Sequence, residues 1–184
     1  MNESNVIDLS EDEKILLKQT IGKEISKIQT SDFTNFYCDT IWIICLDLCD
    51  SYLSIEREDM VAMLFDEPED GGKFKVSKID DVSMYSKYFK TINRVVRGVS
   101  IVMNHVRYEI SQYALTYTKA IIFHFDDCNL VLENWGTFSL AGFVVRLESL
   151  DAENFGLQDD LKFEWYDPEE SEEIPVFTQN IEKL

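Results

Sequence analysis

Two segments of the sequence, 77 residues apart, follow the same pattern of apolar and polar residues. The first is LDLCDSYLSIE at 46–56, and the second is FHFDDCNLVLE at 123–133. In both, apolar residues alternate with other residues on either side of a short acidic turn, and both end on a glutamate. A period of two that is interrupted by Asp or Asn is typical of a β-hairpin. The sequence therefore predicts two related hairpins.

A Gly-containing strand candidate precedes each hairpin, IGKEISKI at 21–28 and VVRGVSIVM at 95–103. With the hairpins they predict two related β-meanders of three strands or more. The common pattern over 21–57 and 95–133 indicates either an internal duplication or convergence. The apolar run TIWIICLDL and the alternating stretch GFVVRLESL are further strand candidates.

Helical signals are short and few. Ser10 and Glu13 form a capping box that predicts a helix through EDEKILLKQ, and EDMVAMLF at 58–65 is expected to form a second short helix. The proline and two glycines of DEPEDGGK at 66–73 predict an exposed loop. We therefore expect an α+β fold that is predominantly antiparallel β, with two related β-meander units and a few short helices.

Length and composition favour a single globular domain over residues 1–184. Hydrophobic residues make up 45% of the chain, which is typical of folded proteins. The four cysteines follow no CxxC spacing, so reduced thiols are expected rather than a disulfide framework. The acidic N-terminal stretch, together with apolar runs shorter than about 18 residues, predicts a cytoplasmic protein.

Net charge restricts the class of partner. The chain has a formal net charge of −18 at pH 7. Nucleic-acid binding depends on Lys and Arg that neutralise phosphates, and anionic membranes repel acidic surfaces, so direct binding to either is not expected. A basic protein is the partner that such a field attracts.

The charge also divides the chain into zones. Residues 1–70 have a net charge of −12, residues 71–119 of +6, residues 120–150 of −3 and residues 151–184 of −9. Pairing between the basic middle and the acidic ends can neutralise part of this charge. Because acids outnumber bases by 18, some face must remain strongly negative.

The polar residues of the second hairpin could be taken for a metal site or a catalytic site, but turn formation explains them better. His124, Asp126, Asp127 and Glu133 are close in sequence. A zinc site, however, needs three or four converging ligands, and a carboxylate dyad needs an apolar pocket to separate its pKa values. Turn-forming Asp and Asn explain the same residues. We predict no catalytic residue, no metal ligand and no cofactor.

The acidic C-terminal segment 164–184 is the strongest candidate for a partner-binding surface. Its aromatic pair lies among carboxylates, and aromatic anchors with a charged rim are typical of protein interfaces. A solvated loop without a binding role is the alternative. The acidic stretch 66–70 is a second candidate. The predicted partner-binding residues are Glu164, Trp165, Tyr166, Asp167, Glu169, Glu170, Glu172, Glu173, Asp66, Glu67, Glu69 and Asp70.

The chain also resembles a known class of proteins. Three features occur in order along the sequence: a GKEISKI strand, an apolar hairpin with an acidic turn, and TYTKAIIFHFDDCNLVLEN followed by FS. In this order they resemble immunity proteins of bacterial contact-dependent growth inhibition and related polymorphic toxin systems. The resemblance covers about residues 20–150 as a pattern. It implies a small, acidic, cytoplasmic protein that binds and blocks a cognate toxin domain, often a basic nuclease. The expected function is therefore non-enzymatic inhibition through acidic surface patches.

Two other functions are compatible with the sequence. One is an acidic nucleic-acid mimic or a general protein-interaction domain, which the same net charge would serve. The other is an enzyme that uses the carboxylates of the 121–133 hairpin.

Overall fold

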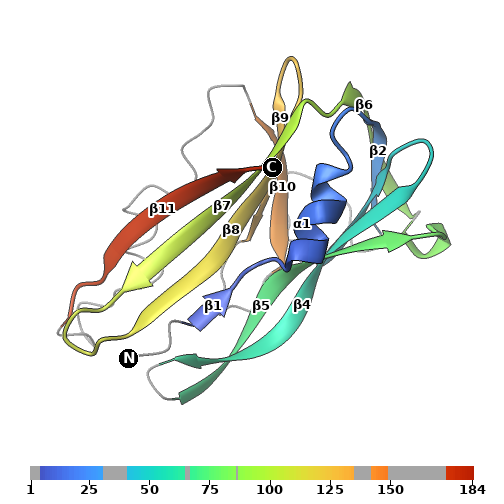
Figure 1. Ribbon diagram of the computed structural model, residues 1–184. Coiled ribbons are helices and arrows are strands. Elements are labelled where there is room, and N and C mark those ends of the chain that lie inside the picture. The colour runs from blue at the N-terminus through green and yellow to red at the C-terminus, as the bar shows by residue number, and fades with distance from the viewer. Residues whose placement is uncertain (1–4, 31–40, 65–66, 86, 135–141, 149–172) are drawn as a thin grey trace.

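Two antiparallel sheets and one short helix make up the described part of the chain (Figure 1). The computed structural model describes residues 5–30, 41–64, 67–85, 87–134, 142–148 and 173–184. The first sheet contains β2 (Glu24–Thr30), β3 (Ile43–Asp47), β4 (Tyr52–Leu64), β5 (Glu67–Ile79) and β6 (Tyr88–Val95). The second contains β7 (Gly98–Arg107), β8 (Ala114–His124), β9 (Asn129–Asn134), β10 (Phe143–Glu148) and β11 (Val176–Lys183), with β1 (Asn5–Ile7) parallel to β8.

The two sheets repeat one strand order. Their orders are β5-β4-β3-β2-β6 and β10-β9-β8-β7-β11, so each is a four-stranded meander whose first strand is flanked by a returning fifth strand. Asp47 pairs with Tyr52 in one hairpin and His124 with Asn129 in the other, which keeps the offset of 77. The predicted β-rich α+β fold with two related meanders is confirmed. A common origin of 21–57 and 95–133 stays a prediction.

The corresponding faces of the two hairpins share one hydrophobic core. The first hairpin contributes Ile44, Leu46, Leu53 and Ile55, and the second contributes Ile121, Phe123, Leu130 and Leu132. All eight side chains are 3% exposed or less. Because alternate residues of a strand point to one face, the repeated apolar pattern places both hairpins against the same core.

The helix α1 (Glu11–Lys18) begins at the predicted capping box. The Ser10 amide donates to Glu13 Oε2 at 2.7 Å, and Ser10 Oγ accepts from the Glu13 amide. Glu13 Oε1 also accepts a hydrogen bond from the Val76 amide of β5 at 2.9 Å. Leu17 of the helix is fully buried in the shared core. The helix therefore packs on the core and satisfies a backbone donor of an outer strand.

The helix predicted for 58–65 and the loop predicted for 66–73 were wrong, although residues 67–70 are exposed as expected. The described parts, 58–64 and 67–73, are extended, and β4 pairs with β5 from Tyr52 with Ile79 to Leu64 with Glu67. β3 accompanies β4 only as far as the pair Ile43–Glu56, so the rest is a two-stranded ribbon. We call residues 57–64 and 67–74 the arm. Figure 1 shows it crossing below α1 toward the end of the molecule where β1 lies.

A second hydrophobic cluster holds the arm, and it explains why the helix prediction failed. The cluster contains Ile7, Ala62, Val106, Tyr108, Leu115, Tyr117 and Phe177, with Met60 and Tyr113 packed against it. Ala and Met favour helix by local propensity, whereas this packing requires Met60 and Ala62 on one face of a strand. Tertiary contacts thus override the local preference.

The remaining elements follow the sequence more closely. The segment after β5 contains a short 3-10 turn (Ser83–Tyr85) and then β6. Phe143–Glu148 of GFVVRLESL form the expected strand, β10, and β11 pairs with β7. None of the helices in the described ranges is long and apolar enough to cross a membrane.

The shared core predicts that the two sheets unfold together. Leu53→Ala and Leu130→Ala each remove a buried side chain, one from each hairpin, and each should lower the free energy of unfolding by about 2–5 kcal/mol. In urea denaturation followed by circular dichroism, both variants should shift one common transition. Two separate transitions, each moved by only one of the variants, would contradict a common core.

Candidate functional site

Three segments that are distant in sequence meet beside β1. Met63 O, near the far end of the arm, accepts hydrogen bonds from Asn5 Nδ2 at 2.7 Å and from Tyr113 Oη at 3.4 Å. Tyr113 belongs to the β7–β8 loop, and that loop in turn contacts the residues that precede β11. This region, seen at the lower left of Figure 1, is called the acidic end. Its described carboxylates are Glu67, Glu69, Asp70, Glu109 and Glu173.

Aromatic packing fixes the loop that joins these segments. The rings of Tyr108 and Tyr113 have centroids 6.2 Å apart, and both residues belong to or pack against the cluster that holds the arm. Burial, followed by the neighbouring Tyr113 and Glu173, raises the pKa of Tyr108 to about 12. The Tyr108 phenol therefore stays neutral at physiological pH, and the negative charge of the acidic end comes from its carboxylates.

Glu173 connects β11 to the β7–β8 loop. Its carboxylate accepts hydrogen bonds from the backbone amides of Ile110 and Ser111, the latter at 3.1 Å. Burial by itself would raise the pKa of Glu173, but these backbone donors lower it below its usual value. The carboxylate is thus ionised at neutral pH, and it holds in place a loop whose Ile110 side chain is 81% exposed.

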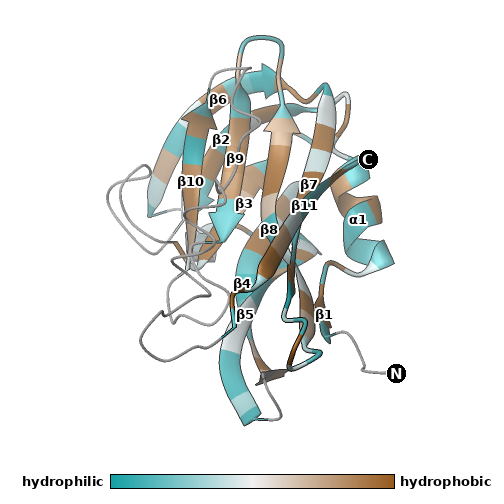
Figure 2. Cartoon of the chain, turned by 90° about the vertical axis from the view of Figure 1, so that its left-hand side faces the viewer, coloured by the Kyte–Doolittle hydropathy of each residue, from teal (hydrophilic) through white to brown (hydrophobic). Residues whose placement is uncertain are grey.

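The carboxylates of the arm are solvent-exposed. Glu67, Glu69 and Asp70 are all exposed, and within the described ranges none of them forms an ion pair. The stretch 58–70 contains six acids and no Lys or Arg. Figure 2 shows the hydrophilic start of β5 projecting below the rest of the molecule. The arm is therefore a source of uncompensated negative charge.

The structure brings together four of the predicted partner-binding residues, namely Glu67, Glu69, Asp70 and Glu173, at one end of the molecule. The other eight lie outside the described residues: Asp66, Glu164, Trp165, Tyr166, Asp167, Glu169, Glu170 and Glu172.

The acids of the second hairpin turn are used within the fold. Arg94 donates three hydrogen bonds to Asp127 at 2.8–3.1 Å, and Arg97 donates two to Asp126 at 2.8 and 2.9 Å. These pairs clamp the β8–β9 turn to the β6–β7 turn. In the first hairpin Asp50, which matches Asp127, accepts hydrogen bonds from Lys23 at 3.1 and 3.2 Å. Both acidic turns therefore serve as anchoring points.

The same pairs shift the ionisation of the two aspartates. Hydrogen bonds from Arg94 lower the pKa of Asp127 from 3.8 to about 2, and those from Arg97 lower the pKa of Asp126. Glu133 has other partners, Lys119 at 3.6 Å and Arg146. A general acid needs a raised pKa, so this arrangement does not favour carboxylate catalysis at the hairpin.

His124 lies in a hydrogen-bonded chain that the sequence analysis missed. Its Nε2 is 2.7 Å from Ser100 Oγ, and its Nδ1 is 2.9 Å from Asn129 Oδ1. Three neighbouring strands supply these residues, so no sequence motif marks them. Ser100 and Asn129 are each 2% exposed, which leaves the hydroxyl inaccessible to a substrate. The chain of hydrogen bonds satisfies buried polar groups.

Metal ligands do not gather in the described part of the protein, where no group of three or more His, Cys, Asp or Glu is placed to hold an ion. His105 contacts Thr116 and Asn180 in β8 and β11. The two histidines therefore occupy separate hydrogen-bond networks.

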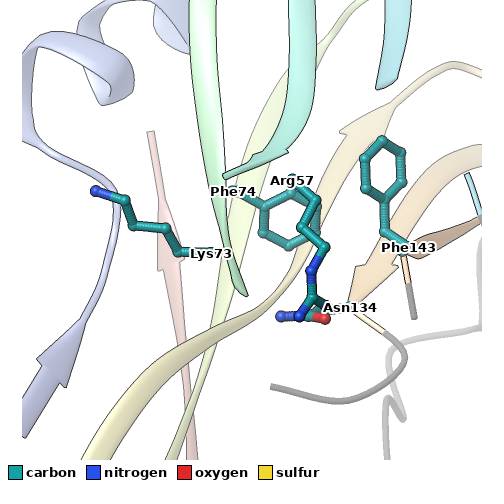
Figure 3. A pocket seen from close by; sticks show the side chains of 6 residues that line it. Arg57, Lys73, Phe74, Asn134 and Phe143 are labelled. Carbon is teal, nitrogen blue, oxygen red and sulfur yellow. The ribbon is translucent and has the colours of Figure 1, made fainter. Parts of the chain in front are cut away.

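A shallow hollow lies at the base of the arm (Figure 3). Arg57, Phe74, Asn134 and Phe143 line it together with Lys73 and Gly142, and it has no room for a water molecule. A Cβ on Gly72 would lie 2.1 Å from Arg57 Nε, so a larger residue there would require the guanidinium to move. The hollow is a packing feature of the arm.

No protein-family model, curated protein or solved structure matches the chain.

The turn clamps predict a specific dependence of stability on pH. Carboxylates whose pKa is lower in the folded chain than in the unfolded chain, where it is about 3.9, stabilise the fold above that value. This contribution is lost as the pH falls toward about 2. The variant D126N/D127N should therefore be less stable than wild type at pH 5, and the difference should shrink steadily down to pH 2.

Urea denaturation at several pH values measures this difference. Asp80→Asn is a suitable control, because Asp80 is exposed and has no ion pair within the described ranges. A difference between wild type and D126N/D127N that stays constant from pH 5 to pH 2 would argue against the clamps.

Proposed function

We propose that the chain is a non-enzymatic immunity protein that binds and neutralises a cognate toxin domain, a basic nuclease. The observation that carries the proposal is the acidic end, where exposed carboxylates of the arm and the ionised Glu173 lie at one end of a rigid β-fold. The resemblance to immunity proteins of polymorphic toxin systems points to the same class of partner.

The distribution of ion pairs supports a basic partner. Several basic residues of the middle zone are paired inside the fold: Lys73 and Lys75 with Glu58, Arg94 with Asp127, and Arg97 with Asp126. Glu67, Glu69 and Asp70 have no such pairs within the described ranges. The surplus negative charge therefore remains available at the arm, where it can steer a positive surface toward the protein.

A nuclease fits this surface for a chemical reason. Enzymes that bind nucleic acid present Lys and Arg to phosphates, so their binding faces are positive. An inhibitor that places carboxylates against such a face uses the same attraction, which accelerates association more than it increases affinity. The proposal assigns this role to the acidic end.

The test is binding and protection against a toxin domain encoded next to the gene of this chain. Wild type should bind the purified domain, rescue the growth of cells that express it, and associate more slowly as salt rises. In the variant E67Q/E69Q/D70N the association rate at low salt should fall about tenfold, because steering charges are removed. Surface plasmon resonance at several salt concentrations measures the rates.

The matched control is E11Q/E24Q/D80N, which removes the same number of exposed carboxylates outside the acidic end. It should change the association rate much less than E67Q/E69Q/D70N does. A neighbouring toxin domain that does not bind the chain and is not neutralised by it would refute the proposed function.

A further inference from the structure

We propose that the outer face of the arm is the contact surface for the partner, with Val61 and Met63 as apolar anchors between carboxylates. The proposal rests on the proposed function and names the side chains and the partner chemistry of that site. The occupant is a folded basic protein whose surface offers an apolar recess between Lys or Arg side chains.

Strand register defines this face. In an antiparallel pair, residues directly opposite each other point to the same side. Val61 pairs with Asp70 and Met63 with Pro68, so these four side chains share one face. The opposite face carries Met60 and Ala62, which pack on the second hydrophobic cluster. The arm is thus held by one face and displays the other.

The displayed face is apolar along its middle and acidic at its edges. Val61 is 65% exposed and Met63 48% exposed. Asp59 lies one step closer to the sheet on the same face, 4.0 Å from the buried Arg57 Nε but with its own side chain 80% exposed, and Asp70 lies directly opposite Val61. Two exposed apolar side chains flanked by exposed carboxylates match an interface with an apolar centre and a charged rim.

Trp42 extends the surface to the base of the arm. The residue is 38% exposed, and the centroid of its ring lies 5.4 Å from the Arg57 guanidinium carbon. Arg57 is on the same face of β4 as Val61 and Met63, and the hollow around it in Figure 3 is closed by Phe74 and Phe143. Trp is enriched among residues that dominate binding energy. We call Trp42, Asp59, Val61, Met63 and Asp70 the outer strip.

The edges of the arm make it unfavourable for a partner to pair a strand of its own with β4 or β5. Contact with the side chains of the arm is favoured instead. Pro68 has no amide hydrogen to donate, and Met63 O is already engaged by Asn5 and Tyr113. Charged residues and proline are the usual means by which exposed strands avoid pairing with other chains. The partner is therefore expected to cover the face of the ribbon.

The charge of the strip selects the partner. Asp59 and Asp70 lie within the stretch 58–70 that has no Lys or Arg, so an acidic or neutral surface gains nothing from approaching it. Cationic side chains on either side of an apolar recess would pair with the two aspartates while Val61 and Met63 enter the recess. Such a fit makes the anchors responsible for slow dissociation and the carboxylates responsible for fast association.

The experiment uses the full-length chain and the toxin domain encoded beside its gene. The variant V61T/M63Q keeps strand-compatible side chains and removes the apolar surface. Its dissociation rate should rise about tenfold or more, with little change in the association rate. The control I181T/F89Q makes the matching changes at two exposed apolar residues, 41% and 65% exposed, that lie outside the acidic end. It should leave both rates unchanged.

The experiment distinguishes failure of the outer strip from failure of the proposed function. If wild type binds and V61T/M63Q dissociates at the wild-type rate, the outer strip is refuted while the proposed function stands. If wild type does not bind, the proposed function fails and the strip fails with it. Circular dichroism and the urea midpoint establish that the variants are folded. The variant W42F keeps an aromatic ring beside Arg57 and should weaken binding less than V61T/M63Q does.

Discussion

The fold depends on one shared hydrophobic core between two sheets of the same strand order. Ile44 and Leu46 of one hairpin and Ile121 and Phe123 of the other are fully buried in it. Neither hairpin could bury its apolar face alone, because a two-stranded ribbon is at best marginally stable in water. The core therefore fixes the register of both sheets, and every other element is positioned by attachment to it.

The arm is the clearest consequence of that arrangement. β4 and β5 continue beyond the first sheet, and the second hydrophobic cluster fixes their extension against the β7–β8 loop and β11. A flexible hairpin would lose conformational entropy when it binds, whereas a fixed one presents its side chains in advance. Carboxylates and exposed apolar residues thus share one end of the molecule, where a basic protein surface is the complementary partner.

Sequence patterns predicted the elements that are marked by a strict period of two or by a capping box. The hairpins around Asp50 and Asp127, the capping box at Ser10 and strand β10 were all expected. The arm was not, since Met60 and Ala62 have helical propensity and are extended only because they pack on Tyr108 and its neighbours. The acidic character of 66–70 was visible in the sequence, but its position beside Glu173 depends on long-range contacts that no local pattern contains.

Hydrogen–deuterium exchange of the free chain and of its complex with the adjacent toxin domain tests the central claim most directly. The account predicts protection on binding at residues 57–72 of the arm and 108–113 of the β7–β8 loop, with little change in β2 and β6. Protection confined to β2 and β6, with the arm unchanged, would contradict it.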